Sequence, residues 1–291
     1  MTLLQSIFLG ALQGLTEFLP VSSSGHLAIA QNLFHINAES SILFDVLLHF
    51  ATLIVVFIVY WRDIWKLIVE AFRMLGDVFY NFGLWLAGRK EGRKLRYRRI
   101  VRSNYRKFVL LLIVSTIPTA IMGYLGRHLV ERASQTLVVP GICLLITGVL
   151  LLIADSAEDC TKIPKDITYT EAGVIGVAQG FATLPGLSRS GSTITACLMC
   201  GFDRRFAVKY SFILSIPAIL GATVLELGEL GGETLGGGMA MNCIAGMITA
   251  ALVGYVCIKS MLVIVKNRKF KYFAYYCFAI GLIAIVGAIV I

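Results

Sequence analysis

The chain has 291 residues, of which 57% are hydrophobic and 15% charged, and its formal net charge is +9. A soluble domain has about a quarter charged residues, and several apolar runs here approach the roughly 20 residues that cross a bilayer. The composition therefore excludes an ordinary soluble domain and indicates an integral membrane protein. The N-terminus has no basic segment followed by a small-residue cleavage site, so we expect no signal peptide.

The first half of the chain begins with a predicted re-entrant hairpin, residues 1–36, in which two short apolar runs flank a polar motif. Residues 42–61 predict the first transmembrane helix, and residues 61–75 predict an amphipathic helix along the membrane interface. Residues 89–107 hold ten Lys and Arg residues and one acid, which accounts for the net charge. The positive-inside rule places this basic loop in the cytoplasm, where it is able to touch anionic lipid headgroups. Nucleic-acid binding is not expected.

Two further spans, residues 108–126 and 137–153, complete the first half, and a polar linker follows at residues 154–170. Residues 171–201 predict a second hairpin. Three last spans are expected at residues 208–227, 242–264 and 272–291. The predicted fold is one all-α membrane domain over residues 1–291, with about six transmembrane helices and two re-entrant hairpins.

The two hairpins carry related motifs at a constant offset of 166 positions. Residues 13–26 read QGLTEFLPVSSSGH, and residues 179–192 read QGFATLPGLSRSGS. Because the basic loop lies inside, the first hairpin enters from outside and the second from inside. This predicts an inverted repeat, with repeat one at residues 1–153 and repeat two at 171–291. Such folds place their site where the repeats meet, with half-helix N-termini aimed at anions.

Arg189 is the strongest single indication of function in the second motif. A charge inside the membrane costs at least about 2.5–3.5 kcal/mol on insertion scales, so it needs a partner. The guanidinium fork matches phosphate. Nearby hydroxyls and backbone N–H groups favour an anion site made of Ser188, Ser190, Gly191 and Thr193. The alternative is an arginine paired with Glu17 or Asp45 for assembly only.

The first motif adds an acid, hydroxyls and an imidazole. Buried, Glu17 would be protonated, bound to a metal or paired with Arg189. Gln13 lies four residues earlier, on the same helix face, where it offers a metal ligand or a structural hydrogen bond. His26 follows Ser23 by three residues, so a helix beginning near Ser22 would bring it within reach as general base or acid. A purely structural histidine is the alternative. Asp45 and His49, near one end of a span, have weaker claims.

Together the two motifs resemble the signature motifs of the bacterial undecaprenyl-diphosphate phosphatases of the BacA (UppP) family, and the resemblance covers nearly the whole chain in length, motif order and spacing. It implies hydrolysis of undecaprenyl diphosphate to the monophosphate carrier lipid, which is recycled for peptidoglycan and cell-wall synthesis and cell shape, and it implies bacitracin resistance. It also implies a divalent cation, Mg²⁺ or Ca²⁺. The expected location is the bacterial inner membrane, with the site open to the extracytoplasmic side.

The resemblance also implies roles for single residues. Glu17 matches the second acid of the family's Glu/Gln-x-x-x-Glu motif and Gln13 its first position, so both are expected at the metal, although a glutamine weakens any two-carboxylate site. Ser23 matches the proposed nucleophile, His26 the motif histidine and Arg189 the phosphate-binding arginine. Direct attack by water is not excluded. The substrate-binding set is expected to be Ser22, Ser24, Gly25, Ser188, Ser190, Gly191 and Thr193.

A lipid or anion transporter, including a flippase, is the alternative function, because inverted repeats with broken helices are common among transporters. A carrier needs an anion site but no nucleophile, so the serine, histidine and glutamate cluster favours the enzyme. The expected partners are a polyprenyl diphosphate lipid and membrane lipids. The sequence leaves a homodimer open.

Overall fold

The computed structural model describes residues 1–33, 38–91, 97–229, 237–267 and 269–290. Within these ranges the regular elements are helices, apart from one isolated bridge between Lys162 and Phe202. The two predicted hairpins are present as helix–turn–helix units. The first consists of α1 (Leu3–Phe18) and α2 (Ser23–Leu33), and the second of α7 (Tyr169–Phe181) and α8 (Arg189–Met199).

Five helices in the described ranges are long and apolar enough to cross a membrane. They are α5 (Asn104–Ser134), α6 (Val138–Ser156), α9 (Arg204–Glu229), α10 (Gly237–Lys266) and α11 (Phe270–Val290). A sixth span requires α3 (Ala38–Val59) and α4 (Trp61–Glu91) to count as one broken span, bent by 87°. The predicted all-α membrane fold is confirmed. The linker contains a 3₁₀ turn, η1 (Pro164–Asp166).

Equivalent helices of the two halves pack against the opposite half. α1 lies along α10, and α7 lies along α5. A Cβ atom added at Gly10 would overlap the carbonyl oxygen of Gly246, and one at Gly176, its partner at the same offset, would overlap that of Ser115. Small residues allow this close approach of helix backbones. The repeat is therefore visible in the packing, whereas its opposite insertion into the membrane stays a prediction.

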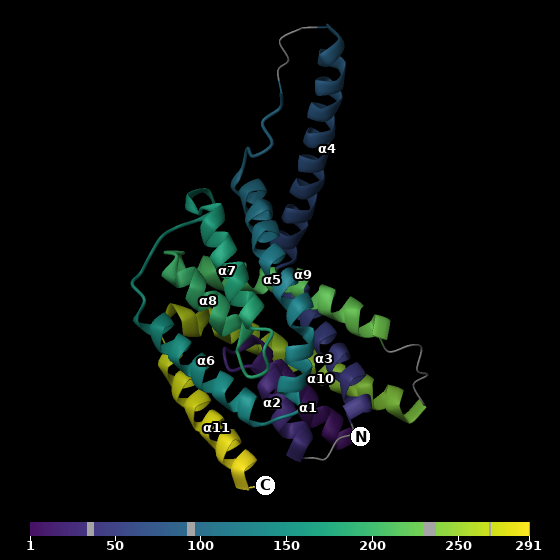
Figure 1. Cartoon of the computed structure of the whole chain (residues 1–291), viewed down its shortest axis with the longest axis vertical. Coiled ribbons are helices and arrows are strands. Elements are labelled where there is room, and N and C mark those ends of the chain that lie inside the picture. Colours follow the sequence, from purple (N-terminus) through teal and green to yellow (C-terminus); the bar gives the residue numbers. More distant parts are fainter. Residues whose placement is uncertain (34–37, 92–96, 230–236, 268, 291) are drawn as a thin grey trace.

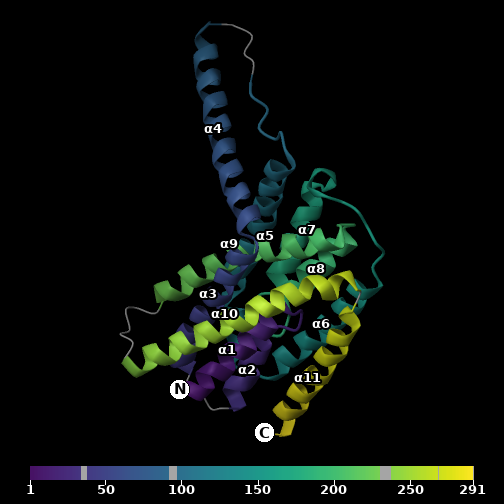
Figure 2. The same cartoon turned by 180° about the vertical axis from the view of Figure 1, so that it is seen from behind.

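Helix α4 differs most from the prediction. The expected amphipathic helix ended at residue 75, but α4 continues for 31 residues to Glu91. It projects from the body of the molecule (Figures 1 and 2). Repeat two has no matching helix, since α10 follows α9 in the described sequence. Part of the predicted basic loop, residues 92–96, lies outside the described residues.

Candidate active site

The first motif turns between α1 and α2 because Pro20 cannot continue a helix. α1 ends at Phe18, and Leu19 has an extended backbone. Ser22 then takes a positive φ of 69°, the only non-glycine residue among those described to do so. This is a strained conformation of the kind that clusters at functional sites. Phe18 anchors the turn, since its buried ring packs edge-on against Phe212 of α9 with centroids 5.6 Å apart.

The two motifs cap their second helices in the same way. The hydroxyl of Ser22 accepts a hydrogen bond from the Gly25 N–H at 3.3 Å, and the hydroxyl of Ser188 accepts one from the Gly191 N–H at 3.1 Å. These four residues were expected to bind substrate directly, which stays a prediction, and in this structure they form the helix caps. The N–H groups earlier in each first turn lack carbonyl partners in their own helix. The first turns of α2 and α8 therefore keep N–H groups of the kind that bind anions.

The caps bring the two motifs into contact. A Cβ atom at Gly25 would lie 2.8 Å from the Cα atom of Gly186. Ser24 and Ser190 lie behind the caps, with hydroxyls 3.3 Å from Ser22 Oγ and 3.4 Å from Ser188 Oγ, respectively. The two motifs thus meet where the repeats come together, as predicted.

An ion pair joins the repeats at this point. Arg189 Nη2 lies 3.1 Å from Glu17 Oε1, and the Glu17 side chain is only 8% exposed. Of the two acids considered as partners, Glu17 therefore makes the pair, while Asp45 accepts a hydrogen bond from Gln31. Arg189 Nη1 is buried and finds no hydrogen-bond partner in the described part of the chain. An arginine held for assembly alone would leave this buried donor unsatisfied, which is costly.

Glu17 also organises the hydroxyl expected to be the nucleophile. Ser23 Oγ donates a hydrogen bond to Glu17 Oε2 at 2.6 Å. Gln13 Nε2 donates to the same oxygen at 3.2 Å. The structure therefore brings Gln13, Glu17, Ser23 and Arg189 together, in agreement with the sequence analysis.

His49 is a site residue that the sequence analysis underestimated. Its Nδ1 atom lies 3.4 Å from Glu17 Oε2 and 2.9 Å from Gln13 Nε2. The contact forms because α3 packs against α1. The only signal in the sequence was a polar residue in an apolar span, and it was assigned to the solvated end of the helix.

His26 lies differently from the prediction. α2 does begin beside Ser22, but both ring nitrogens of His26 face away from Ser23. Nδ1 lies 2.7 Å from the carbonyl oxygen of Ser22, and Nε2 lies 2.9 Å from the hydroxyl of Tyr276. The Tyr276 ring stacks on the imidazole with centroids 5.5 Å apart. Tyr276 belongs to α11, far along the chain, so no local spacing pointed to it.

Thr193 is fully buried beneath the second motif. Its hydroxyl donates to the carbonyl oxygen of Arg189 at 2.8 Å and contacts Ser211. It therefore supports the Arg189 turn from behind, where the sequence analysis expected it to face substrate. A small cavity of about 20 Å³, room for about one water molecule, is lined by Glu17, Phe18, Thr52, Val56, Arg189, Ser190, Ser211, Phe212, Ser215 and Ile219.

The oxygen atoms at the site fit a divalent cation only in part. Gln13 Oε1 is buried without a hydrogen-bond partner in the described chain, so a carbonyl oxygen is available. Both Glu17 oxygens, however, already face Arg189 or Ser23. No cluster of three His, Cys, Asp or Glu side chains able to hold a metal occurs among the described residues. A cation here would need most of its ligands from a bound anion, as Mg²⁺ often does with phosphates.

Comparison with known proteins identifies the family. Residues 6–283 match the family model described as bacitracin resistance protein BacA. The chain belongs to the BacA family. Its relatives include the undecaprenyl-diphosphatases of Alkaliphilus metalliredigens (strain QYMF), 40% identical over 285 residues and 98% of each chain, and of Halothermothrix orenii (strain H 168 / OCM 544 / DSM 9562), 40% identical over 288 residues and 99% of each chain. The undecaprenyl-diphosphatase of Methanosphaera stadtmanae (strain ATCC 43021 / DSM 3091 / JCM 11832 / MCB-3) is 37% identical over 289 residues and 99% of each chain.

The relatives' name, undecaprenyl-diphosphatase, indicates the chemistry against which the paired motifs can be compared. An arginine with an unsatisfied donor lies against two helix N-termini, and a serine hydroxyl is hydrogen-bonded to a carboxylate beside it. The first arrangement has the donors that suit a phosphate-like anion, and the second has the hydrogen bond that activates a nucleophile in other enzymes. The two groups that phosphoryl transfer requires therefore lie side by side.

Proposed function

We propose that this chain hydrolyses undecaprenyl diphosphate to undecaprenyl phosphate and phosphate. The observation that carries the proposal is the junction of Arg189 with Glu17 and Ser23, where Arg189 Nη1 is buried and unsatisfied. The relatives reported above carry the name undecaprenyl-diphosphatase. None of those three is named as a transporter, so the relatives favour the enzyme over the carrier. The product lipid is the carrier for cell-wall synthesis, and its recycling accounts for bacitracin resistance.

In the proposed reaction, the diphosphate binds at Arg189 and at the N-termini of α2 and α8. The cavity holds about one water molecule, so side chains must move to admit the headgroup. Arg189 stays beside the transferred phosphoryl group, because stabilising its charge is the main demand of phosphoryl transfer. The prenyl tail then lies between helices, in the membrane.

Ser23 and Glu17 carry out the proton transfer in the covalent route. A bond forms between Ser23 Oγ and the terminal phosphorus, and the serine proton passes to Glu17, to which it is already hydrogen-bonded. The bond from that phosphorus to the bridging oxygen breaks and releases undecaprenyl phosphate. Water then hydrolyses the phosphoserine. In the alternative route water attacks directly, oriented by Ser23 and deprotonated by Glu17.

His26 holds the Ser22 carbonyl through Nδ1, and thereby the strained turn that aims Ser23. A direct role for His26 as general acid or base requires Nε2 to exchange its Tyr276 contact for the substrate. His49 and Gln13 keep the Glu17 carboxylate in place from the opposite side.

A divalent cation, Mg²⁺ or Ca²⁺, is proposed to arrive with the diphosphate. Gln13 Oε1 and the Glu17 carboxylate are the protein oxygens that would hold it, and it would neutralise phosphate charge. The site is proposed to open on the extracytoplasmic face of the bacterial inner membrane. The positive-inside assignment of the basic loop supports that orientation.

The decisive experiment measures phosphate release from a prenyl diphosphate by purified protein in detergent, with and without EDTA. Arg189→Ala and Glu17→Ala are compared with Arg132→Ala, which removes an exposed arginine at the end of α5. We expect release by wild type and Arg132→Ala, and loss in both motif variants and in EDTA. Wild-type protein that binds the lipid but releases no phosphate with any divalent metal would refute the proposal and favour transport.

A further inference from the structure

Helix α4 carries an exposed apolar seam along its length. Eight side chains at alternating spacings of four and three residues share one helix face. Each is at least 38% exposed: Trp61, Trp65, Ile68, Phe72, Leu75, Phe79, Phe82 and Leu86. The other apolar face of α4 is occupied, since Ile64, Leu67 and Met74 are buried in the main core. An apolar seam on one face of a helix with polar residues on the other is the pattern of a helix at a membrane interface.

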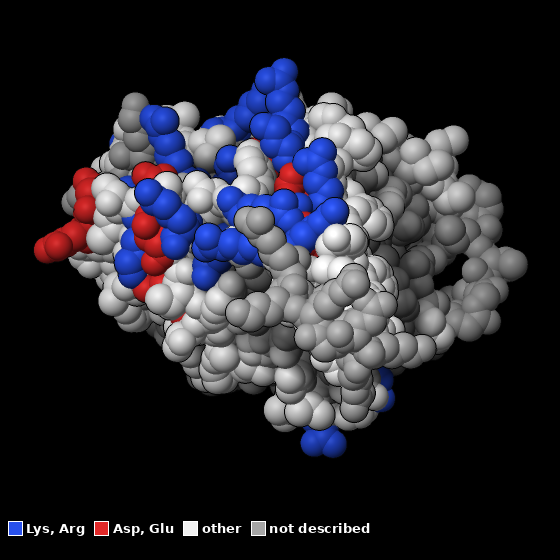
Figure 3. Space-filling model, turned by 90° about the horizontal axis from the view of Figure 1, so that it is seen from above, with Lys and Arg blue, Asp and Glu red and all other residues white. Residues whose placement is uncertain are grey.

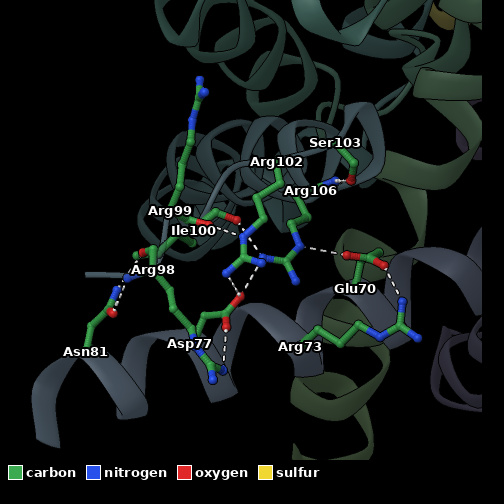
Figure 4. A network of polar contacts seen from close by, with 10 residues as sticks. All are labelled: Glu70, Arg73, Asp77, Asn81, Arg98, Arg99, Ile100, Arg102, Ser103 and Arg106. Atoms are coloured by element: carbon green, nitrogen blue, oxygen red, sulfur yellow. Dashed lines mark hydrogen bonds and ion pairs between the residues drawn. The ribbon is translucent and has the colours of Figure 1, made fainter. Parts of the chain in front are cut away.

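A cluster of arginines lies on the polar face of α4, opposite the seam, and belongs to the segment that leads into α5 (Figure 4). Arg106 is buried, and it donates to Asp77 and Glu70 at 2.7 Å each. Arg98 and Arg102 approach the same Asp77 carboxylate at 3.4 Å, and their side chains are about half exposed. One carboxylate thus serves three guanidinium groups, so Arg98 and Arg102 keep N–H donors that Asp77 does not use. Arg99 is exposed and points away from the network.

The combined charge of α4 and the segment that leads into α5 is strongly positive. Residues 61–87 and 97–107 contain eight Lys and Arg residues but three Asp and Glu residues. Viewed from the end at which α4 projects, Lys and Arg side chains gather on one face (Figure 3). Two such surfaces would repel each other, since like charges brought together oppose association. The charge therefore argues against a second copy of the chain as the occupant.

An anionic bilayer surface matches both features. Amphipathic helices with an aromatic apolar face and basic residues on the polar face lie at the boundary of headgroups and acyl chains, bound by apolar burial and by attraction to anionic lipids. Trp61 and Trp65 belong to the seam, and Trp85 lies next to it. Tryptophan side chains favour that boundary. The sequence predicts residues 42–61 as a span, and α4 turns 87° from α3, which is the change of direction that a helix along the membrane surface requires.

We propose that α4 and residues 97–106 form a docking surface for anionic phospholipids on the cytoplasmic leaflet. The seam inserts among acyl chains, and Arg98, Arg99 and Arg102 bind the phosphate headgroups. This interaction is separate from the proposed phosphatase site, because its residues belong to α4 and the segment before α5, whereas Glu17, Ser23 and Arg189 belong to α1, α2 and α8.

The tryptophans make the proposal testable in the intact protein. The chain has three, Trp61, Trp65 and Trp85, and all belong to α4, so intrinsic fluorescence reports on this helix alone. The full-length protein is placed in nanodiscs of phosphatidylcholine with a minority of phosphatidylglycerol. Either lipid in turn carries brominated acyl chains, which quench nearby tryptophan.

We expect brominated phosphatidylglycerol, mole for mole, to quench roughly twofold or more better than brominated phosphatidylcholine. High salt should abolish that preference. The variant Arg98→Gln/Arg99→Gln/Arg102→Gln should lose it. The charge-matched control Arg132→Gln/Lys165→Gln/Lys271→Gln, at exposed positions elsewhere, should keep it. Phosphate release in detergent should be unchanged in both, which shows that each is folded.

Equal quenching by the two lipids in wild type would overturn the proposal, as would a preference that survives the triple arginine variant. Tryptophans quenched by aqueous iodide and not by either lipid would place α4 in water and refute insertion. Fluorescence that depends on protein concentration and ignores lipid composition would assign the seam to a second copy.

Discussion

Arg189 of α8 and Glu17 of α1 form an ion pair of 3.1 Å, although they belong to different repeats. Each sits beside the N-terminus of a half-helix, and the same carboxylate accepts the Ser23 hydroxyl hydrogen bond. Neither repeat contains the complete proposed site. The proposal therefore makes catalysis depend on how the two hairpins meet.

Replacing Arg189 with lysine should nearly abolish activity even though the charge is kept. A lysine ammonium lacks the planar fork that meets both Glu17 and a phosphate. We expect kcat/KM for a prenyl diphosphate to fall roughly 10²–10³-fold, the effect of losing one preorganised transition-state donor. Steady-state phosphate release measures it. The Arg205→Lys variant, at an exposed position in the first turn of α9, should retain wild-type activity.

Ser23→Ala distinguishes the two chemical routes. If Ser23 is the nucleophile, this variant should release phosphate only at the uncatalysed rate, and rapid acid quench of wild type should trap phosphoserine at position 23. If Ser23 only orients water, residual turnover should persist and no phosphoserine should form. Ser24→Ala, which leaves the hydrogen bond from Ser23 to Glu17 intact, is the matched control. Full activity of Ser23→Ala would exclude both roles.

Tyr276→Phe should reduce turnover without unfolding the protein. The change removes the hydroxyl 2.9 Å from His26 Nε2 and keeps the stacked ring. Losing one such hydrogen bond typically costs about 1 kcal/mol, so we expect kcat to fall roughly fivefold with KM little changed. Tyr275→Phe, an exposed neighbour, serves as control. Equal kinetics of the two variants would remove Tyr276 from the site.

The close packing between halves can be tested at Gly176. Its added Cβ atom would overlap the backbone of α5, whereas a Cβ at Gly173 on the same helix would meet nothing within 4 Å. We expect Gly176→Ala to lower the free energy of unfolding by about 1–3 kcal/mol, the usual cost of overpacking. Gly173→Ala should be neutral or slightly stabilising. The midpoint of thermal unfolding in detergent compares them, and identical midpoints would contradict the packing.

The local sequence was enough to predict the hairpins. Each consists of two apolar runs too short to cross the membrane, separated by a proline and a serine–glycine cluster that end a helix. The local sequence was also enough to place Gln13, Glu17, Ser23 and Arg189 in one site, since the two motifs share an offset and opposed hairpins must meet. The sequence pattern did not predict the full length of α4, since the expected helix ended at residue 75 and α4 ends at Glu91. The apolar seam continues at helical spacing through Phe82 and Leu86, but the glycines at 76 and 83 obscured it.

The sequence by itself determined the all-α membrane class, the two hairpins and the residue types of the site, because hydropathy and turn chemistry act over short stretches of chain. Only the tertiary structure decided which groups touch. It brought His49 to Glu17 and Tyr276 to His26, and it turned the hydroxyls of Ser22 and Ser188 into helix caps. Those contacts join residues on different helices or depend on a strained turn, so their geometry follows from packing, which spacing along the chain does not encode.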